Sequence, residues 1–117
     1  MKLELTVDEL SPGCKVIRAA GEIDMHTVQS LDDTVLDLLD EEPQAIVLNL
    51  SKLNYISSSG IGVIMNCHAE MVGRGGVLVL TGVHGNVEQS LQLTGILDMT
   101  PHAKTEEEAI KMVAELK

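Results

Sequence analysis

The alternation of apolar and polar residues at the start of the chain predicts two paired strands. Residues 2–7 (KLELTV) follow the two-residue period of a half-buried strand, and residues 14–21 (CKVIRAAG) are expected to form a second one. The sequence SPG at 11–13 is a turn signal between them. Because this connection is so short, the two strands are expected to pair antiparallel as a hairpin.

The next segment has the spacing of an amphipathic helix. Its apolar residues recur every three to four positions, at Val28, Leu31, Val35, Leu38 and Leu39. Aspartates occupy the opposite face. Asp24 precedes the pattern and is expected to be the N-cap, and Pro43 prevents the helix from continuing.

Two aliphatic runs, at 45–50 (AIVLNL) and 77–82 (VLVLTG), are typical of strands covered on both faces. The segment 60–72 between them is long enough for about three helical turns, and it ends at the GRGG sequence of residues 73–76. Two strands joined by a helix form a parallel βαβ unit, which is expected to be right-handed.

The last third of the chain predicts smaller elements. Residues 86–93 are expected to form a short helix, and residues 96–99 (ILDM) a short edge strand before Pro101. A final helix is expected to start at Thr105, with Glu108 completing its capping box. The whole pattern predicts one α/β domain over residues 1–117, with about four helices and a mixed sheet of four to five strands.

Composition and charge exclude several classes of function. The 117 residues are 44% hydrophobic, enough for one packed core, and the net charge is −10, which argues against nucleic-acid binding. Neither a signal peptide nor a membrane-spanning apolar run is found, so a cytoplasmic protein that does not enter a membrane is expected. Cys14 and Cys67 form no CxxC motif and are expected to be reduced thiols.

Three consecutive serines, Ser57, Ser58 and Ser59, stand where the strand leads into the second helix. One serine could simply cap the helix, since its oxygen accepts a backbone N–H. A catalytic elbow would need Gly-x-Ser-x-Gly, but Ile56 takes the place of the first glycine. The third alternative is display of a serine for phosphorylation, because a phosphate there would face free N–H groups at the positive end of a helix.

No motif in the chain predicts a cofactor or a metal. The nucleotide-binding sequence GxxxxGK[ST] is absent, and Gly60 and Gly62 lack the third glycine of a dinucleotide fingerprint. The four histidines lack the spacing of metal ligands. We therefore expect no enzyme activity, no cofactor and no metal.

The second helix is apolar on more than one face. Its apolar residues include Ile61, Ile64 and Met65, which surround more of the helix than one core-facing stripe requires. Either the helix is buried on most sides, or some of these residues are exposed and bind a partner.

The motifs of the chain, taken together, resemble a known family. They are GEID at 21–24, VLNLSKLNYISSSGIGVIM at 47–65, GGVLVLTG at 75–82 and LTGILDM at 93–99. In this order they resemble the STAS domain in its bacterial anti-sigma factor antagonist form, over nearly the whole chain.

The resemblance implies a function in partner switching. Unphosphorylated antagonists bind an anti-sigma factor that is also a serine kinase; the kinase phosphorylates them, the complex dissociates, and a serine phosphatase resets the system. Carried over by motif, Ser58 is the phosphoacceptor, supported by Asp24, Ser57, Ser59 and Gly60. Ser57 stands where the family usually has aspartate, so a non-phosphorylated STAS adaptor or scaffold remains the alternative.

Overall fold

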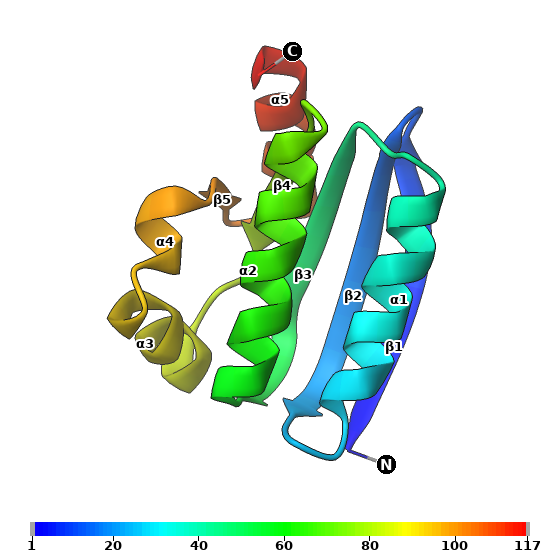
Figure 1. The fold of residues 1–117 in the computed structure, drawn as a ribbon. Coiled ribbons are helices and arrows are strands. Elements are labelled where there is room, and N and C mark those ends of the chain that lie inside the picture. Colours follow the sequence, from blue (N-terminus) through cyan, green and yellow to red (C-terminus); the bar gives the residue numbers. More distant parts are fainter. Residues whose placement is uncertain (1, 117) are drawn as a thin grey trace.

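The structure, a computed structural model, describes residues 2–116. Figure 1 shows five strands and five helices in the order β1 (Leu3–Ser11), β2 (Cys14–Ile23), α1 (Val28–Asp40), β3 (Ala45–Ile56), α2 (Ser58–Gly73), β4 (Val77–Thr81), α3 (Gly85–Leu93), α4 (Ile96–Met99), β5 (His102–Ala103) and α5 (Glu106–Leu116). The single α/β domain expected from the sequence is confirmed in fold class, with α4 as an additional helix of one turn.

The five strands form one mixed sheet in the order β1-β2-β3-β4-β5. Strands β1 and β2 pair antiparallel around a tight turn in which Gly13 adopts a left-handed conformation (φ 79°), so the predicted hairpin is confirmed. The remaining pairs, β2 with β3, β3 with β4 and β4 with β5, are all parallel. All the carboxyl ends of β2, β3, β4 and β5 therefore point the same way.

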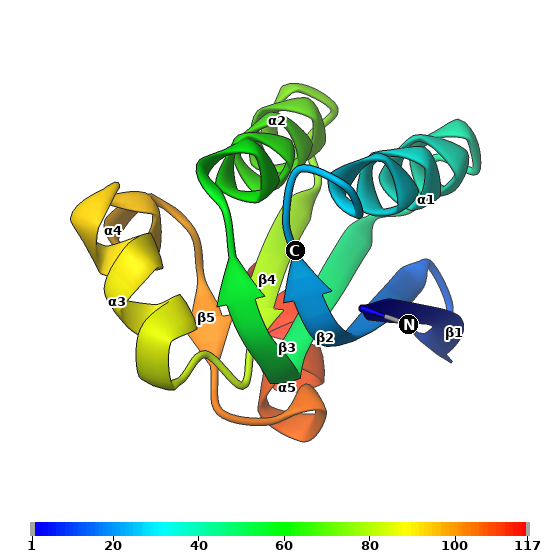
Figure 2. The same ribbon diagram turned by 90° about the horizontal axis from the view of Figure 1, so that it is seen from below.

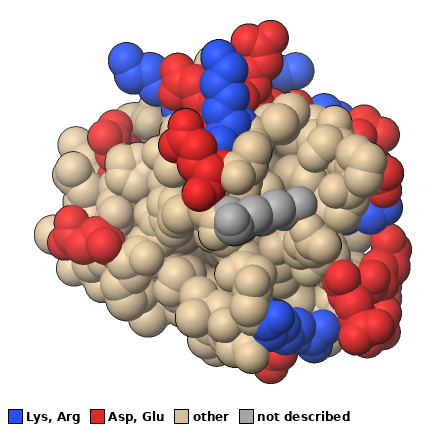
Figure 3. All heavy atoms as spheres, turned by 90° about the horizontal axis from the view of Figure 1, so that it is seen from above, with Lys and Arg blue, Asp and Glu red and all other residues tan. Residues whose placement is uncertain are grey.

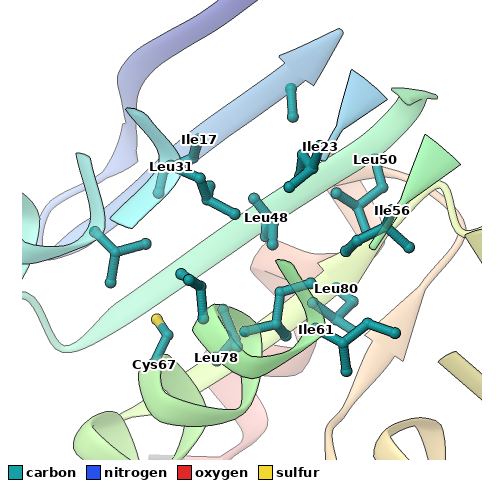
Figure 4. Close-up of a cluster of buried hydrophobic side chains, with 14 of the residues drawn as sticks. Ile17, Ile23, Leu31, Leu48, Leu50, Ile56, Ile61, Cys67, Leu78 and Leu80 are labelled. Atoms are coloured by element: carbon teal, nitrogen blue, oxygen red, sulfur yellow. The ribbon is translucent and has the colours of Figure 1, made fainter. Parts of the chain in front are cut away.

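Helices cover both faces of this sheet. Figure 2 shows α1 and α2 side by side on one face and α5 on the other, with α3 and α4 beside β5. The larger core lies beneath α1 and α2, where side chains such as Leu31, Leu48 and Leu80 meet (Figure 4). A smaller core lies beneath α5, and its members are Cys14, Val16, Ala45, Val47, Val79, Ala109 and Val113.

Two expectations about the elements are wrong. Helix α1 has Thr27 as its N-cap residue, three positions after Asp24, and Asp24 instead holds the turn that precedes the helix. Residues 96–99 form the helical turn α4, and the short edge strand is β5, which follows Pro101. The capping box of the last helix is confirmed: Thr105 Oγ1 accepts the N–H of Glu108 at 3.2 Å.

The two cysteines belong to different cores on opposite faces of the sheet. Cys14 lies in the core beneath α5, and Cys67 points from α2 into the core that α1 and α2 cover. Burial raises the pKa of the Cys67 thiol to about 12, which keeps it protonated and unreactive at neutral pH. Between Lys2 and Leu116, no helix is long and apolar enough to cross a membrane.

Thr81 carries a buried hydroxyl that the fold leaves unsatisfied. Its side chain is 1% exposed, and Oγ1 has no hydrogen-bond partner among residues 2–116. Thr81→Val keeps the shape of the side chain and removes this hydroxyl, so we expect the variant to be more stable by about 1 kcal/mol. A urea titration measures the difference.

Thr100→Val is the matched control for this prediction. Thr100 is as buried as Thr81, at 2% exposed, but its Oγ1 lies 3.4 Å from Nδ1 of His68. Its replacement removes a partnered hydroxyl and is expected to give no gain in stability. Equal effects of the two substitutions would contradict the explanation.

Candidate functional site

The candidate site lies where β2 and β3 end side by side. Ile23 and Ile56, the last residues of these two parallel strands, are partners in the ladder. The pairing continues one residue further, since the N–H of Ser57 donates to the carbonyl oxygen of Ile23 at 2.8 Å. The GEID and SSSG segments, more than thirty residues apart, therefore meet at the carboxyl edge of the sheet, the side seen in Figure 2. Partners and ligands commonly approach α/β sheets from this edge.

The three serines occupy different positions at the start of α2. Ser57 is the N-cap: its backbone is extended (φ −83°, ψ 167°) and its Oγ accepts the N–H of Gly60 at 3.2 Å. The Oγ atoms of Ser57 and Ser59 lie 2.8 Å apart and share a hydrogen bond. Ser58 is the first residue of the helix, it is exposed, and its hydroxyl makes no hydrogen bond within residues 2–116. Of the three serines, only Ser58 is both exposed and without a side-chain hydrogen bond among the described residues.

Gly60 allows the helix to start close to the sheet. A Cβ atom added at Gly60 would lie 2.6 Å from Cγ2 of Ile23 and 2.9 Å from Cγ1 of Ile56. Both isoleucines are buried, so neither side chain can move away freely. Gly60 thus contributes to the site by holding the serine segment against the ends of β2 and β3.

Asp24 lies next to the serine segment as the residue that follows β2. Its Oδ1 accepts the N–H groups of His26 at 2.8 Å and Thr27 at 3.0 Å, and its Oδ2 pairs with Nζ of Lys2 at 3.2 Å. These backbone N–H groups, together with the Lys2 ammonium, lower the pKa of the Asp24 carboxyl to about 2. The carboxylate therefore stays charged at any physiological pH.

A pH titration tests this arrangement. Because the folded-state pKa of Asp24 lies below its ordinary value near 3.8, its charged interactions stabilise the fold above that value and are lost as pH falls towards 2. In a ¹³C NMR titration we expect the Asp24 carboxyl to be the last aspartate of the chain to protonate. An Asp24 midpoint near 4 would contradict the hydrogen-bond arrangement.

The structure corrects the expectation that Ile61, Ile64 and Met65 form a docking surface together. Ile61 is 6% exposed and Ile64 is 1% exposed, because both point into the core beneath α2. Met65 is 39% exposed and is the only one of the three available to a partner. Helix α2 buries six of its sixteen residues. Because Met65 and Val72 are exposed, each of the two alternatives left open by the apolar pattern holds in part.

Sequence analysis did not identify two exposed apolar side chains beside the site. Met25, which follows Asp24, is 77% exposed, and Tyr55, two residues before Ser57, is 48% exposed. Tyr55 is the only aromatic residue of the chain, and this was the signal available in the sequence. Exposed side chains of these types, methionine and tyrosine, are common in surfaces that contact proteins.

The fold and this edge define a small α/β domain with a serine-capped helix at the carboxyl edge of its sheet. The family model for the STAS domain matches residues 7–109. The anti-sigma F factor antagonist of Paenibacillus polymyxa is 32% identical over 94 residues, which cover 76% of this chain and 77% of that protein. The chain belongs to the STAS domain family.

Solved structures agree with this assignment. An anti-sigma factor antagonist from Mycobacterium paratuberculosis has the same fold, with a TM-score of 0.88 at 22% identity, covering 97% of this chain and 95% of that one. The unphosphorylated form of the antagonist SpoIIAA is 26% identical, with a TM-score of 0.83 and coverage of 96% and 97%. The phosphorylated form of the Bacillus protein SpoIIAA is 25% identical, with a TM-score of 0.75 and coverage of 94% and 99%.

Proposed function

We propose that this protein is an anti-sigma factor antagonist in a partner-switching pathway. Unphosphorylated, it binds an anti-sigma factor that is also a serine kinase, and phosphorylation of Ser58 releases it. A serine phosphatase returns it to the binding form. The protein itself catalyses no reaction and acts in the cytoplasm on transcription, through its partner.

The exposed hydroxyl of Ser58 is the observation that supports this proposal most. A kinase must reach the acceptor oxygen, and among the three consecutive serines only Ser58 is both exposed and without a side-chain hydrogen bond in the described chain. The first N–H groups of a helix have no partner within it, so a phosphate on Ser58 has donors nearby. The similarity to SpoIIAA, whose structure is known in unphosphorylated and phosphorylated forms, supports regulation by phosphorylation.

Ser57 replaces the aspartate that precedes the acceptor in the family motif. Serine and aspartate are both good N-caps, and here Ser57 Oγ accepts the Gly60 N–H, so the cap is kept without the charge. A phosphate on Ser58 then meets one negative neighbour fewer. The substitution is thus compatible with phosphorylation, while a non-phosphorylated adaptor remains the competing function.

The arrangement of the serines does not favour hydrolase chemistry. A nucleophilic serine needs a histidine within hydrogen-bond reach. Within residues 2–116 no histidine side chain bonds to Ser57, Ser58 or Ser59, and the ring of His68 faces Thr100 instead. This supports a binding protein.

Site-resolved phosphorylation tests the proposed function. The chain is incubated with ATP and a candidate anti-sigma factor with serine kinase activity, and mass spectrometry locates the phosphate. We expect one phosphate on Ser58, which is lost in Ser58→Ala and retained in Ser59→Ala. Phosphate on Ser57 or Ser59 alone would show a different acceptor, and no phosphate with a kinase that binds the chain would favour the adaptor.

A further inference from the structure

A groove runs between α1 and α2 on the outer side of the helical layer. It has a volume of about 600 Å³ and is lined by both helices. On α1 the lining residues include Asp32, Leu36 and Asp40, and on α2 they extend from Val63 to Gly73. Each helix follows a strand of the parallel part of the sheet, and the two helices lie side by side (Figure 1).

Apolar side chains form the floor of this groove. Val35, Leu39 and Cys67 form part of the floor as the outer surface of the core, and Leu36 stands on the rim with 52% of its surface exposed. On the α2 side the lining residues include Ala69 and Gly73, and a Cβ atom added at Gly73 would meet nothing within 4 Å. Small residues on one wall leave room for side chains that enter from a third helix.

Most of the charged residues around the groove are acidic. Helix α1 carries Asp32, Asp33, Asp37 and Asp40, helix α2 carries Glu70, and neither helix contains lysine or arginine. The one cation in the lining, Arg74, already donates to the carbonyl oxygen of Leu39 at 2.7 Å and to Glu70 at 3.4 Å. Among residues 2–116, no other lysine or arginine lines the groove.

We propose that this groove binds a positively charged amphipathic helix of a partner protein. Apolar residues of such a helix, at spacings of three and four, would contact Val35, Leu36 and Val63, while its lysines and arginines would face Asp32, Asp40 and Glu70. The groove begins more than one helical turn beyond Ser58. It is a second docking surface, and it goes beyond the proposed switch at the serine segment.

The face at the opposite edge of the sheet from the serines has a different character. Figure 3 shows acidic and basic residues spread over several parts of this face, with uncharged surface between them. Exposed apolar side chains lie close together here at Val72, Met99 and Leu116. The charges on this face are of both signs, whereas the groove is lined by three acidic residues and one base. The two surfaces therefore make separable predictions about where such a helix binds.

The test uses a designed peptide and the intact chain. The probe is a peptide of about 14 residues made of leucine and lysine at helical spacing, roughly 21 Å long as a helix. We expect its addition to the ¹⁵N-labelled chain to shift backbone signals of α1 and α2, and we expect the double variant of Asp32→Asn and Asp40→Asn to bind at least tenfold more weakly. Leu36→Gln, at an exposed position, is also expected to weaken binding.

The matched control removes the same charge from outside the groove, with Asp33→Asn and Asp37→Asn in one variant. We expect its affinity for the peptide to stay within about twofold of the original chain, because these carboxylates do not line the groove. Equal losses in both double variants would overturn the proposal and indicate a general effect of negative charge. Signal shifts around Val72 and Met99, or equal binding of a peptide whose leucines alternate with lysines, would also overturn it.

Ser58→Glu separates this surface from the switch. We expect the peptide to bind this variant within about twofold of the original chain, because Ser58 lies outside the groove. A large loss of peptide binding in Ser58→Glu would overturn the independence of the two surfaces. Failure of the peptide to bind leaves the phosphorylation test unaffected.

Discussion

Replacing Ser58 with glutamate is expected to lower the affinity for an anti-sigma factor at least about tenfold and to leave the fold intact. A charge placed at the centre of a docking surface must lose water or meet a like charge when the partner closes over it. The fold itself tolerates the charge, because an acidic residue in the first turn of a helix is typically favourable by roughly 0.3–1 kcal/mol. Isothermal titration calorimetry and thermal melts measure the two effects separately.

Ser58→Gln is the control, since it has the size of glutamate without the charge. We expect it to bind more tightly than Ser58→Glu and to melt within about 4 °C of the original chain. A melting temperature that falls strongly in Ser58→Glu would contradict the switch, because loss of binding would then follow from unfolding.

Gly60→Ala is expected to destabilise the protein by about 2 kcal/mol, through overpacking. The added methyl group would lie 2.6 Å from Cγ2 of Ile23, so the first turn of α2 would have to move away from the strands. Alanine is a better helix former than glycine by about 1 kcal/mol, which offsets part of the steric cost. The steric cost is therefore larger than the expected net loss of stability. Urea unfolding curves give the free energies of unfolding.

Gly62→Ala tests whether this loss comes from contact with the strands. Gly62 is in the same helix, and a Cβ atom there would meet nothing within 4 Å. We expect this variant to be more stable by roughly 0.5–1 kcal/mol, from helix propensity alone. A similar loss at both positions would contradict the role assigned to Gly60.

Much of the fold was predictable because its local patterns are strong. The alternation in residues 2–7 and the SPG turn predicted the hairpin, and the aliphatic runs at 45–50 and 77–82 predicted two central strands of the parallel sheet. The ILDM segment was assigned wrongly, because a four-residue apolar run has too few positions to distinguish a strand from a helical turn.

The start of α1 was misplaced for a different reason. Asp24 has the side chain of an N-cap, but its carboxylate caps the N–H groups of a turn, and regular helix begins only at Val28. Aspartate binds the N–H groups of turns and helix ends alike, so residue type alone does not separate the two.

At the site, the sequence identified the serine segment but not the state of each hydroxyl. The side chains of Ser57 and Ser59 share a hydrogen bond, and that of Ser58 does not take part in it. This difference depends on side-chain rotation at the start of the helix, which the sequence does not reveal. The Lys2–Asp24 ion pair joins residues 22 positions apart and arises from the pairing of β1 with β2. The burial of Ile61 and Ile64 likewise follows from how α2 packs on the sheet.

The most direct test of the switch places a phosphate on one chosen serine. Phosphoserine is incorporated genetically at position 58 or at position 59, and each protein is titrated into the anti-sigma factor alongside the unmodified chain. We expect phosphoserine at 58 to weaken binding about a hundredfold, equivalent to roughly 2.8 kcal/mol, and phosphoserine at 59 to weaken it less. Binding of the position-58 form as tight as that of the unmodified chain would contradict the assignment of Ser58 as the residue that controls the partner.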